Sequence, residues 1–252
     1  MVTTGVLVAI GALLAGGVIN NFADQLPRKS RLTRPLCDRC HTPLPPQRWF
    51  ALTRSLFGGC SCSADRVPRH VIVELAAILV LSGLKVSSPA GMQFWLLALL
   101  LACFGLIIII DLEHRLILNV VLAMTAVAAL SYGLLGTHRR WGETLGGGVA
   151  GYGLMHLVFL GGRLFVRAAG RRQDTASTEF ALGRGDVSLG AIIGLAAGWP
   201  GVLPALFHGV CAGGSGAPII RLRRDYRLFT AMPYGLFLVS GAAAFLWLQA
   251  AI

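Results

Sequence analysis

Long apolar stretches alternate with short polar connections along most of the chain. Because the hydrocarbon core of a bilayer is about 30 Å thick, a helix needs about 20 apolar residues to cross it. Most of the stretches have about this length, so the pattern predicts an all-α polytopic membrane protein with about eight transmembrane helices. The expected spans are approximately 3–22, 68–87, 92–110, 116–136, 144–166, 186–199, 201–213 and 231–251.

The sixth and seventh stretches are short and are separated by Trp199-Pro200-Gly201. Proline and glycine interrupt helices, so these two stretches form either one broken helix or a tight hairpin of two helices. We favour the hairpin, because it gives the remaining helices a consistent orientation.

The composition supports a membrane protein. The chain has 55% hydrophobic and only 13% charged residues, and its mean hydropathy is +0.70. These values exclude an ordinary water-soluble globule of this size. The net charge of +11 would suit a nucleic-acid partner, but such a partner requires basic residues gathered on one face of a soluble domain. Here they lie between apolar segments, so we expect no nucleic-acid partner.

The positions of the basic residues predict the orientation. Lys85, Arg139 and Arg140 lie in connections on one side of the predicted membrane, and the other lysines and arginines lie on the opposite side. The richly basic connections are 23–69, 111–115, 163–186 and 214–228. Because basic loops stay in the cytoplasm, we expect these segments inside and the N-terminus outside. The first stretch has no basic n-region and no small-residue cleavage signature, so we expect it to be a retained helix.

Two carboxylates stand out at the membrane boundary. Asp111 follows four isoleucines in IIIIDLEHRL, and Asp186 follows Gly183 and Gly185 in ALGRGDVSLG. The predicted orientation puts both in the inner leaflet. An acid there can simply mark a helix end, where the macrodipole favours it at an N-terminus. However, an acid in hydrocarbon costs roughly 2.5–3.5 kcal/mol at the helix centre and less near the interface, so such a residue usually has a function.

Two chemistries use a pair of carboxylates in this position. In aspartic proteolysis, two acids share a proton and activate a water between them. In a proton-coupled transporter, intramembrane acids carry protons along a path near the midplane. Asp111 and Asp186 by themselves fit both.

Several motifs in chain order resemble the type IV prepilin peptidases, which are membrane aspartyl proteases with a G-x-G-D motif. Asp186 lies in such a motif, and IDLEHRLILN resembles the first-aspartate motif of the family. GGVINNFADQLPRK resembles the end of the first helix, RHVIVEL the start of the second and AMPYGLFLVSG the last helix. The resemblance therefore covers nearly the whole chain.

This resemblance implies a bacterial inner-membrane endopeptidase with Asp111 and Asp186 as its catalytic pair. Members of the family cut the basic leader from prepilins and pseudopilins at the cytoplasmic face, and many then N-methylate the new N-terminus with S-adenosylmethionine. Gly183 and Gly185 would leave room for the extended substrate backbone. Leu118 stands where proline is usual, and Ser188 where lysine is common, so rate and specificity are the properties most open to change.

The resemblance also suggests where methylation would occur. Asn20 ends the first helix and Glu74 begins the second, and these two residues flank the inner loop. Glu74 is the acid best placed to meet a cationic amine or sulfonium. The alternative is that Glu74 only pairs with Arg69 or His70 near the membrane surface.

The inner loop between the first two helices contains paired cysteines, Cys37-Asp-Arg-Cys40 and Cys60-Ser-Cys62. The loop has little apolar periodicity, and four thiolates on Zn²⁺ would supply folding energy that it otherwise lacks. A cytoplasmic position disfavours disulfides. The second pair is C-x-C where the family has C-x-x-C, so His41 could replace one ligand, and free thiols are the alternative to zinc.

The chain is thus expected to comprise a first transmembrane helix (1–22), a cytoplasmic cysteine-containing loop (23–69) and a transmembrane aspartyl peptidase domain (70–252). The loop would contribute the zinc module and part of the methyltransferase. Membrane lipid and the prepilin or pseudopilin substrate are the expected partners.

A metal analysis tests the zinc prediction. If Cys37, Cys40, Cys60 and Cys62 are ligands, protein purified without chelator should contain about one zinc per chain, because four ligands complete one tetrahedral site. Replacing Cys37 and Cys40 together by serine should remove the metal, whereas replacing Cys103 should not. Metal-free wild-type protein would contradict the prediction.

Overall fold

The computed structural model describes residues 2–27, 50, 52, 67–87, 91–168, 183–221 and 234–251. The chain divides into two compact units, residues 1–94 and 95–252. Within the described ranges the secondary structure is helical, and six of these helices are long and apolar enough to cross a membrane. The predicted all-α polytopic membrane fold is therefore confirmed.

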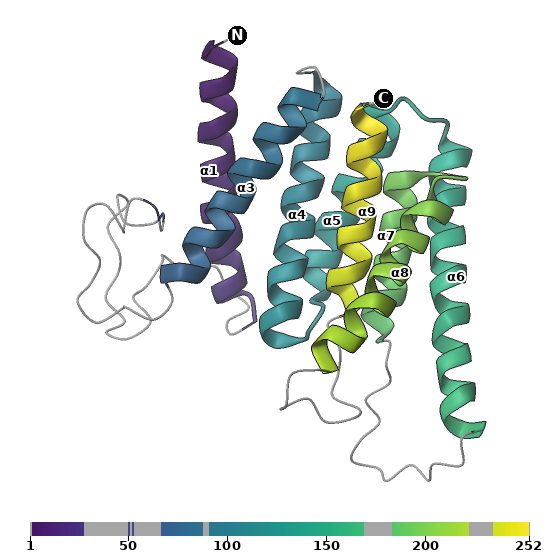
Figure 1. The fold of residues 1–252 in the computed structure, drawn as a ribbon. Coiled ribbons are helices and arrows are strands. Elements are labelled where there is room, and N and C mark those ends of the chain that lie inside the picture. Colours follow the sequence, from purple (N-terminus) through teal and green to yellow (C-terminus); the bar gives the residue numbers. More distant parts are fainter. Residues whose placement is uncertain are drawn as a thin grey trace. The chain divides into compact units, whose positions relative to one another are not determined.

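The helices follow the predicted apolar stretches closely (Figure 1). Their bounds are α1 Val2–Gln25, α3 Val67–Ser87, α4 Met92–His114, α5 Asn119–Ser131, the π-helix η2 Tyr132–Gly136, α6 Trp141–Ala168, α7 Arg184–Ala197, α8 Val202–Arg221 and α9 Tyr234–Ala251. The predicted hairpin is confirmed, since α7 and α8 are separate helices that pack against each other.

In the first unit, α1 packs against α3. Gly16 makes this close approach possible, because a Cβ atom there would lie only 2.8 Å from Cα of Glu74. The next turns of α1 continue along the same contact, and Asn20 is buried in it. Small residues at helix contacts let backbones approach in membranes, where hydrophobic burial alone gives little preference between lipid and protein.

In the second unit, α7 contacts α5, α6, α8 and α9 (Figure 1). Its closest neighbour is α6, where glycines of both helices face each other. A Cβ atom at Gly194 would collide with the carbonyl oxygen of Gly147, and one at Gly190 with the carbonyl of Gly151 and the side chain of Met155. The two GxxxG spacings, one on each helix, thus fix the position of α7 against α6.

Arg139 ties the connection between η2 and α6 to two other helices. Its Nη1 donates to the carbonyl oxygen of Ala196 at 2.8 Å, and its Nη2 donates to Oε1 of Gln249 at 2.9 Å. Burial lowers the pKa of the Arg139 guanidinium from its ordinary value, while Tyr132 and Glu143 oppose this shift. Arg139, in the connection between η2 and α6, therefore links the C-terminal ends of α7 and α9.

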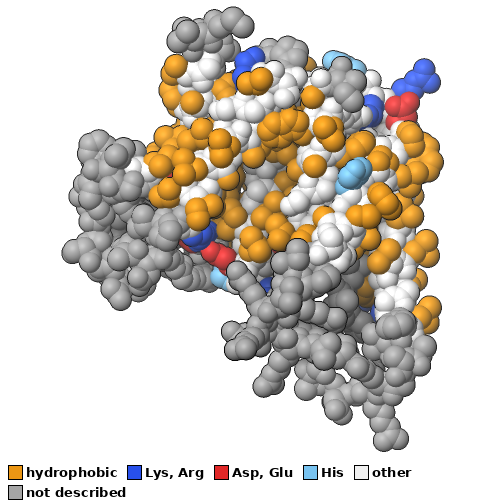
Figure 2. Space-filling model, in the orientation of Figure 1, with side chains coloured by type: hydrophobic (Ala, Val, Ile, Leu, Met, Phe, Trp, Pro, Cys, Tyr) orange, Lys and Arg blue, Asp and Glu red, His pale blue; other side chains and the backbone are white. Residues whose placement is uncertain are grey.

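The outer faces of the helices expose large apolar side chains, among them Val127, Val149 and Leu157. Figure 2 shows hydrophobic side chains gathered along the helices on the face that it displays. A water-soluble monomer rarely presents such continuous apolar surface. Lipid is the solvent that suits it.

The close packing of α6 and α7 generates a stability prediction. Gly194→Ala should lower the free energy of unfolding by about 1–3 kcal/mol, because the added methyl has no space beside Gly147. Gly146→Ala is the matched control, since a Cβ atom at Gly146 meets nothing within 4 Å. Thermal unfolding in detergent should separate the two variants, and equal stabilities would contradict the packing argument.

Candidate active site

Asp111 lies in the last turn of α4, yet its carboxyl is oriented toward the start of α9. The residue is only 5% exposed, and its Oδ2 accepts the main-chain N–H of Leu236 at 3.0 Å. Leu236 is the third residue of α9, so this N–H is one of those that a helix leaves unpaired at its N-terminus. The carboxyl of Asp111 is thus held by the positive end of another helix.

Asp186 occupies the matching position in α7. It is the third residue of this helix and 7% exposed, and its Oδ2 accepts the main-chain N–H of Gly183 at 2.8 Å. This is half of a capping box, in which the side chain of the third helical residue reaches back to the residue before the helix. Asp186 therefore caps α7 as well as lying beside Asp111.

The two carboxyls are close enough to act on each other. The carboxyl of Asp111 lies within electrostatic range of the carboxyl of Asp186. Ile117 packs against the glycines next to this pair. A Cβ atom at Gly185, which precedes Asp186, would lie 2.9 Å from Cβ of Ile117. A Cβ atom at Gly235 would lie 3.4 Å from Cδ1 of Ile117 and 3.0 Å from Oδ2 of Asp111. The structure thus brings together two acids that are far apart in the sequence.

A second group of buried polar residues lies in the first unit, between α1 and α3. Glu74 is fully buried, and its Oε2 accepts the main-chain N–H of Leu52 at 2.9 Å. Asn20 is 4% exposed and donates from Nδ2 to the carbonyl oxygen of His70 at 3.0 Å. The structure therefore places both predicted methylation residues in one helix contact, Asn20 on α1 and Glu74 on α3.

Arg69 and His70 pair with Asp24 in this contact. Nη1 of Arg69 lies 2.6 Å from Oδ1 of Asp24, and Nε2 of His70 lies 2.9 Å from Oδ2. Asp24 is thus a site residue that the sequence did not single out. A signal was present, because Asp24 comes one helical turn after Asn20 and lies on the same face of α1.

Comparison with known proteins identifies relatives of this chain. The type IV leader peptidase family matches residues 96–217. A prepilin leader peptidase/N-methyltransferase of Pseudomonas aeruginosa is 30% identical over 223 residues, which cover 86% of this chain and 72% of that protein. A protein of the same name from Stutzerimonas stutzeri is 30% identical over 222 residues, 84% of this chain and 70% of that protein. The chain belongs to the type IV leader peptidase family. No solved structure matches it significantly.

Membership of this peptidase family confirms that the chain is an enzyme and a membrane peptidase. The match to the family contains both Asp111 and Asp186. The two relatives also match across most of this chain, so the similarity extends beyond the peptidase segment.

The structure gives a physical account of the two departures from the family pattern. Leu118 precedes α5 in an extended conformation, with φ −79° and ψ 128°. Proline favours these angles, so leucine keeps the backbone path that a proline would impose. Ser188 is directed back along α7, where its Oγ donates to the carbonyl oxygen of Arg184 at 3.4 Å. It supplies no positive charge near Asp186.

The sequence did not identify three residues around the acids. Tyr234 begins α9 and lies within electrostatic range of Asp186, while its ring packs over Gly213 of α8. Leu236 contributes only its main-chain N–H, and Ile117 contributes only packing. The motif AMPYGLFLVSG marked the segment that holds Tyr234, but a contact between the end of α4 and the start of α9 is visible only in three dimensions.

The predicted substrate glycines differ in their surroundings. Among the described residues, a Cβ atom at Gly183 would meet Oδ2 of Asp186, at 3.5 Å, and main-chain nitrogen of Gly185, at 3.9 Å. Gly185, by contrast, faces Ile117 directly. The substrate role of both residues stays a prediction.

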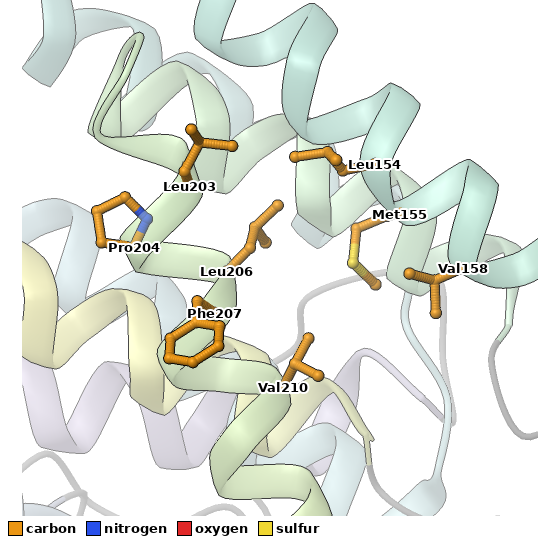
Figure 3. Close-up of a pocket in the computed structure, with 8 residues that line it drawn as sticks. All are labelled: Leu154, Met155, Val158, Leu203, Pro204, Leu206, Phe207 and Val210. Atoms are coloured by element: carbon orange, nitrogen blue, oxygen red, sulfur yellow. The ribbon is translucent and has the colours of Figure 1, made fainter.

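An apolar groove of about 500 Å³ lies between α6 and α8 (Figure 3). Figure 3 shows Leu154, Met155 and Val158 on one side, and α8 supplies the other lining residues. Its lining contains no titratable side chain, so the groove offers no acid–base chemistry. Met155 also fills the space beside Gly190, which lies one helical turn after Asp186 on α7.

The predicted zinc ligands Cys37, Cys40, Cys60 and Cys62 lie outside the described residues. In the parts of the chain that the structure describes, no group of three or more His, Cys, Asp and Glu side chains could hold a metal ion. The zinc site therefore stays a prediction from the cysteine spacing.

Proposed function

We propose that this chain removes the leader from prepilins or pseudopilins by means of a water activated between Asp111 and Asp186. The observation that carries the proposal is the electrostatic contact between two buried carboxyls in a chain of a peptidase family. The name of its two relatives, prepilin leader peptidase/N-methyltransferase, indicates the substrate class.

The chemistry requires one proton shared by the pair. The ionised carboxylate takes a proton from the water, and the water oxygen attacks the peptide carbonyl carbon. The protonated carboxyl donates to the carbonyl oxygen, which gives a neutral tetrahedral intermediate. Collapse of this intermediate breaks the C–N bond. The leaving nitrogen takes up the proton that the first carboxylate received from the water, and a hydroxyl of the intermediate gives its proton to the second carboxylate. Two like charges at short range favour this singly protonated state over the doubly ionised one.

Hydrogen bonds from two helix N-termini would keep the acids in position. Each aspartate has one oxygen bound to a main-chain N–H, from Leu236 in one case and from Gly183 in the other. Fixed main-chain donors do not reorganise during the reaction, which is an advantage for a catalytic group. The other carboxyl oxygen of each aspartate would then be available to hydrogen-bond to the water and the substrate.

The same geometry argues against the transporter alternative. A proton path would place acids at successive depths along the membrane. Asp111 and Asp186 instead lie side by side at helix ends, which suits a single reaction centre.

Single substitutions test the two-aspartate mechanism. Asp111→Asn and Asp186→Asn should each reduce leader cleavage by at least about 100-fold, the usual contribution of a positioned acid or base. Purified variants in detergent would be incubated with candidate prepilins, and the mass of the product N-terminus would be measured. Asp174→Asn and Asp225→Asn are the matched controls, because the sequence places both residues in polar connections.

The pH dependence gives an independent readout. Wild-type cleavage should fall at high pH, where both acids ionise, and at low pH, where both are protonated. A variant at Asp111 or Asp186 with a cleavage rate close to that of the wild type would show that the mechanism is wrong.

A second activity, N-methylation of the new N-terminus, is supported by the contact between α1 and α3. Glu74 is a fully buried carboxyl that already accepts an N–H from a peptide main chain. Asn20 adds an acceptor, since its buried Oδ1 has no hydrogen-bond donor among the described residues. We propose that these two oxygens bind the N-terminal ammonium of the cleaved product.

The methyl donor would be S-adenosylmethionine, a sulfonium that transfers a methyl group to a nitrogen. Glu74 suits such a cationic reactant, because a buried carboxylate is stabilised by an opposite charge. Arg69 and His70 pair with Asp24, so Asp24 is a second carboxyl between these helices and takes part in binding both basic side chains.

Mass spectrometry tests this activity. The cleaved N-terminus should gain the mass of one methylene group when S-adenosylmethionine is supplied. Glu74→Gln should lower this gain by about 10-fold or more, in line with the loss of a charge-assisted contact of about 1.5–3 kcal/mol. Glu113→Gln is the matched control on α4. If the wild-type product never gains this mass, the chain has the peptidase activity alone.

The positive-inside pattern supports a cytoplasmic position for the loop 23–69 and for the aspartate pair, with the N-terminus outside. We propose the bacterial inner membrane as the location, and membrane lipid as the solvent of the apolar helix faces.

A further inference from the structure

The pair formed by His70 and Asp24 has no role in the chemistry described so far. His70 is 7% exposed, and its Nε2 lies 2.9 Å from Oδ2 of Asp24. Asp24 also binds Arg69 through Oδ1, so one carboxylate links two side chains of α3 to α1. A histidine oriented by a carboxylate is a common arrangement for a general base.

The hydrogen bond fixes which nitrogen of His70 can act. A carboxylate accepts, so Nε2 must carry the hydrogen that it donates to Asp24. In the neutral ring the lone pair is then on Nδ1. Arg69 also binds Asp24, so the carboxylate is fixed between two side chains of α3.

His70 and Glu74 lie on the same face of α3, because four residues complete about one helical turn. Their positions are about 6 Å apart along the axis, at 1.5 Å per residue. On α1, Asn20 lies opposite His70, whose carbonyl oxygen accepts from Nδ2 of Asn20, and Gly16 lies opposite Glu74. An amine held by Glu74 and Asn20 would therefore lie within one helical turn of His70, which one bridging water can span.

Methyl transfer needs such a base. An ammonium next to the buried carboxylate of Glu74 is stabilised in its charged form, which has no lone pair with which to attack. The contact that binds the amine thus also prevents it from reacting until a proton is removed.

We propose that His70, positioned by Asp24, is the base that deprotonates the N-terminal ammonium before methyl transfer. The proton moves from the ammonium to Nδ1 of His70. The nitrogen lone pair then attacks the sulfonium methyl carbon, the C–S bond breaks with its electron pair going to sulfur, and the products are a secondary ammonium and a neutral thioether. His70 finally releases its proton to water. This assignment rests on the proposed N-methylation.

The experiment uses the full-length enzyme in detergent and a synthetic peptide with a free N-terminus, so that methylation is measured apart from cleavage. Rates would be followed from about pH 6 to 9, a range that includes the ordinary titration of histidine and of an α-amino group. Among the described residues, Asp24 and Asn20 on α1 contact His70, and Arg69, which binds Asp24, and Glu74 are the neighbouring charged residues of α3.

The expected result is a split between kcat and KM. His70→Gln should lower kcat for methylation by about 100-fold at neutral pH. The KM for the peptide should stay the same, because Glu74 and Asn20, which are proposed to bind its ammonium, are intact. The remaining rate should rise only at higher pH, where the ammonium itself loses its proton. His156→Gln is the matched control, since His156 lies on α6, stacked on Tyr152, in the other compact unit.

Asp24→Asn provides a second test if His70→Gln does not fold. Without the carboxylate, the midpoint of the rate–pH profile should move to lower pH, because the negative charge that favours the protonated imidazole is lost. A wild-type kcat and pH profile in His70→Gln, or an unmoved midpoint in Asp24→Asn, would overturn the assignment of the base. If the wild-type enzyme itself adds no methyl group, the proposed methylation falls and the base assignment falls with it.

Discussion

A carboxyl group that is buried among apolar helices must be held by hydrogen bonds, and in the second unit main-chain N–H groups at helix starts provide them. Asp111 binds the start of α9 and Asp186 binds the start of α7. The unpaired N–H groups of a helix N-terminus cannot be left without partners in a membrane, and neither can the acids. The helix N–H groups donate to the carboxyls, so both groups are satisfied by the same hydrogen bonds. The positions of the acids and of the helix starts therefore depend on each other.

The location of α7 is therefore decisive for the site. Glycines let this helix approach α6 so closely that any side chain at Gly190 or Gly194 would collide with main-chain atoms of its neighbour or with Met155. Arg139 fixes the opposite end of α7 through the carbonyl oxygen of Ala196. With both ends and one face constrained, Asp186 has little freedom to move relative to Asp111. Precise placement of this kind is what a reaction between fixed groups requires.

Much of this arrangement could be predicted from the sequence, because apolar length and charge patterning act locally. The eight apolar stretches correspond to the observed helices, and the hairpin at Trp199-Pro200-Gly201 was expected from its turn residues. Two helix ends were placed clearly too early. α8 was expected to end at 213 but continues to Arg221. α4 continues through Asp111 to His114, and the positive φ of 52° at Arg115 follows its end. The first apolar-to-polar change along a helix is not its end when the polar residue is itself buried.

Contacts between segments that are distant in the chain could not be predicted from the sequence. Neither Leu236 nor Ile117 carries a chemical group that marks it, because one contributes a main-chain N–H and the other a packing surface. The pairing of Arg69 and His70 with Asp24 was also unexpected, since Glu74 had been considered as the partner of these two basic residues. A charge pair across two helices depends on their register, and a single sequence does not contain it.

The two units place buried carboxyls beside different partners, and the difference suits the two reactions that we propose. In the second unit an acid lies beside an acid, and mutual repulsion would favour one proton shared by the pair. In the first unit an acid lies beside a histidine and an arginine, so the carboxylate stays charged and orients the imidazole. Peptide hydrolysis releases an amine, which takes up a proton at neutral pH because the pKa of an α-amino group is about 7.7–8.0. The product of the first reaction is therefore an ammonium, and a site that methylates it must begin by removing that proton. A carboxyl pair that holds a proton is unsuited to this step, whereas a histidine next to a carboxylate is suited to it.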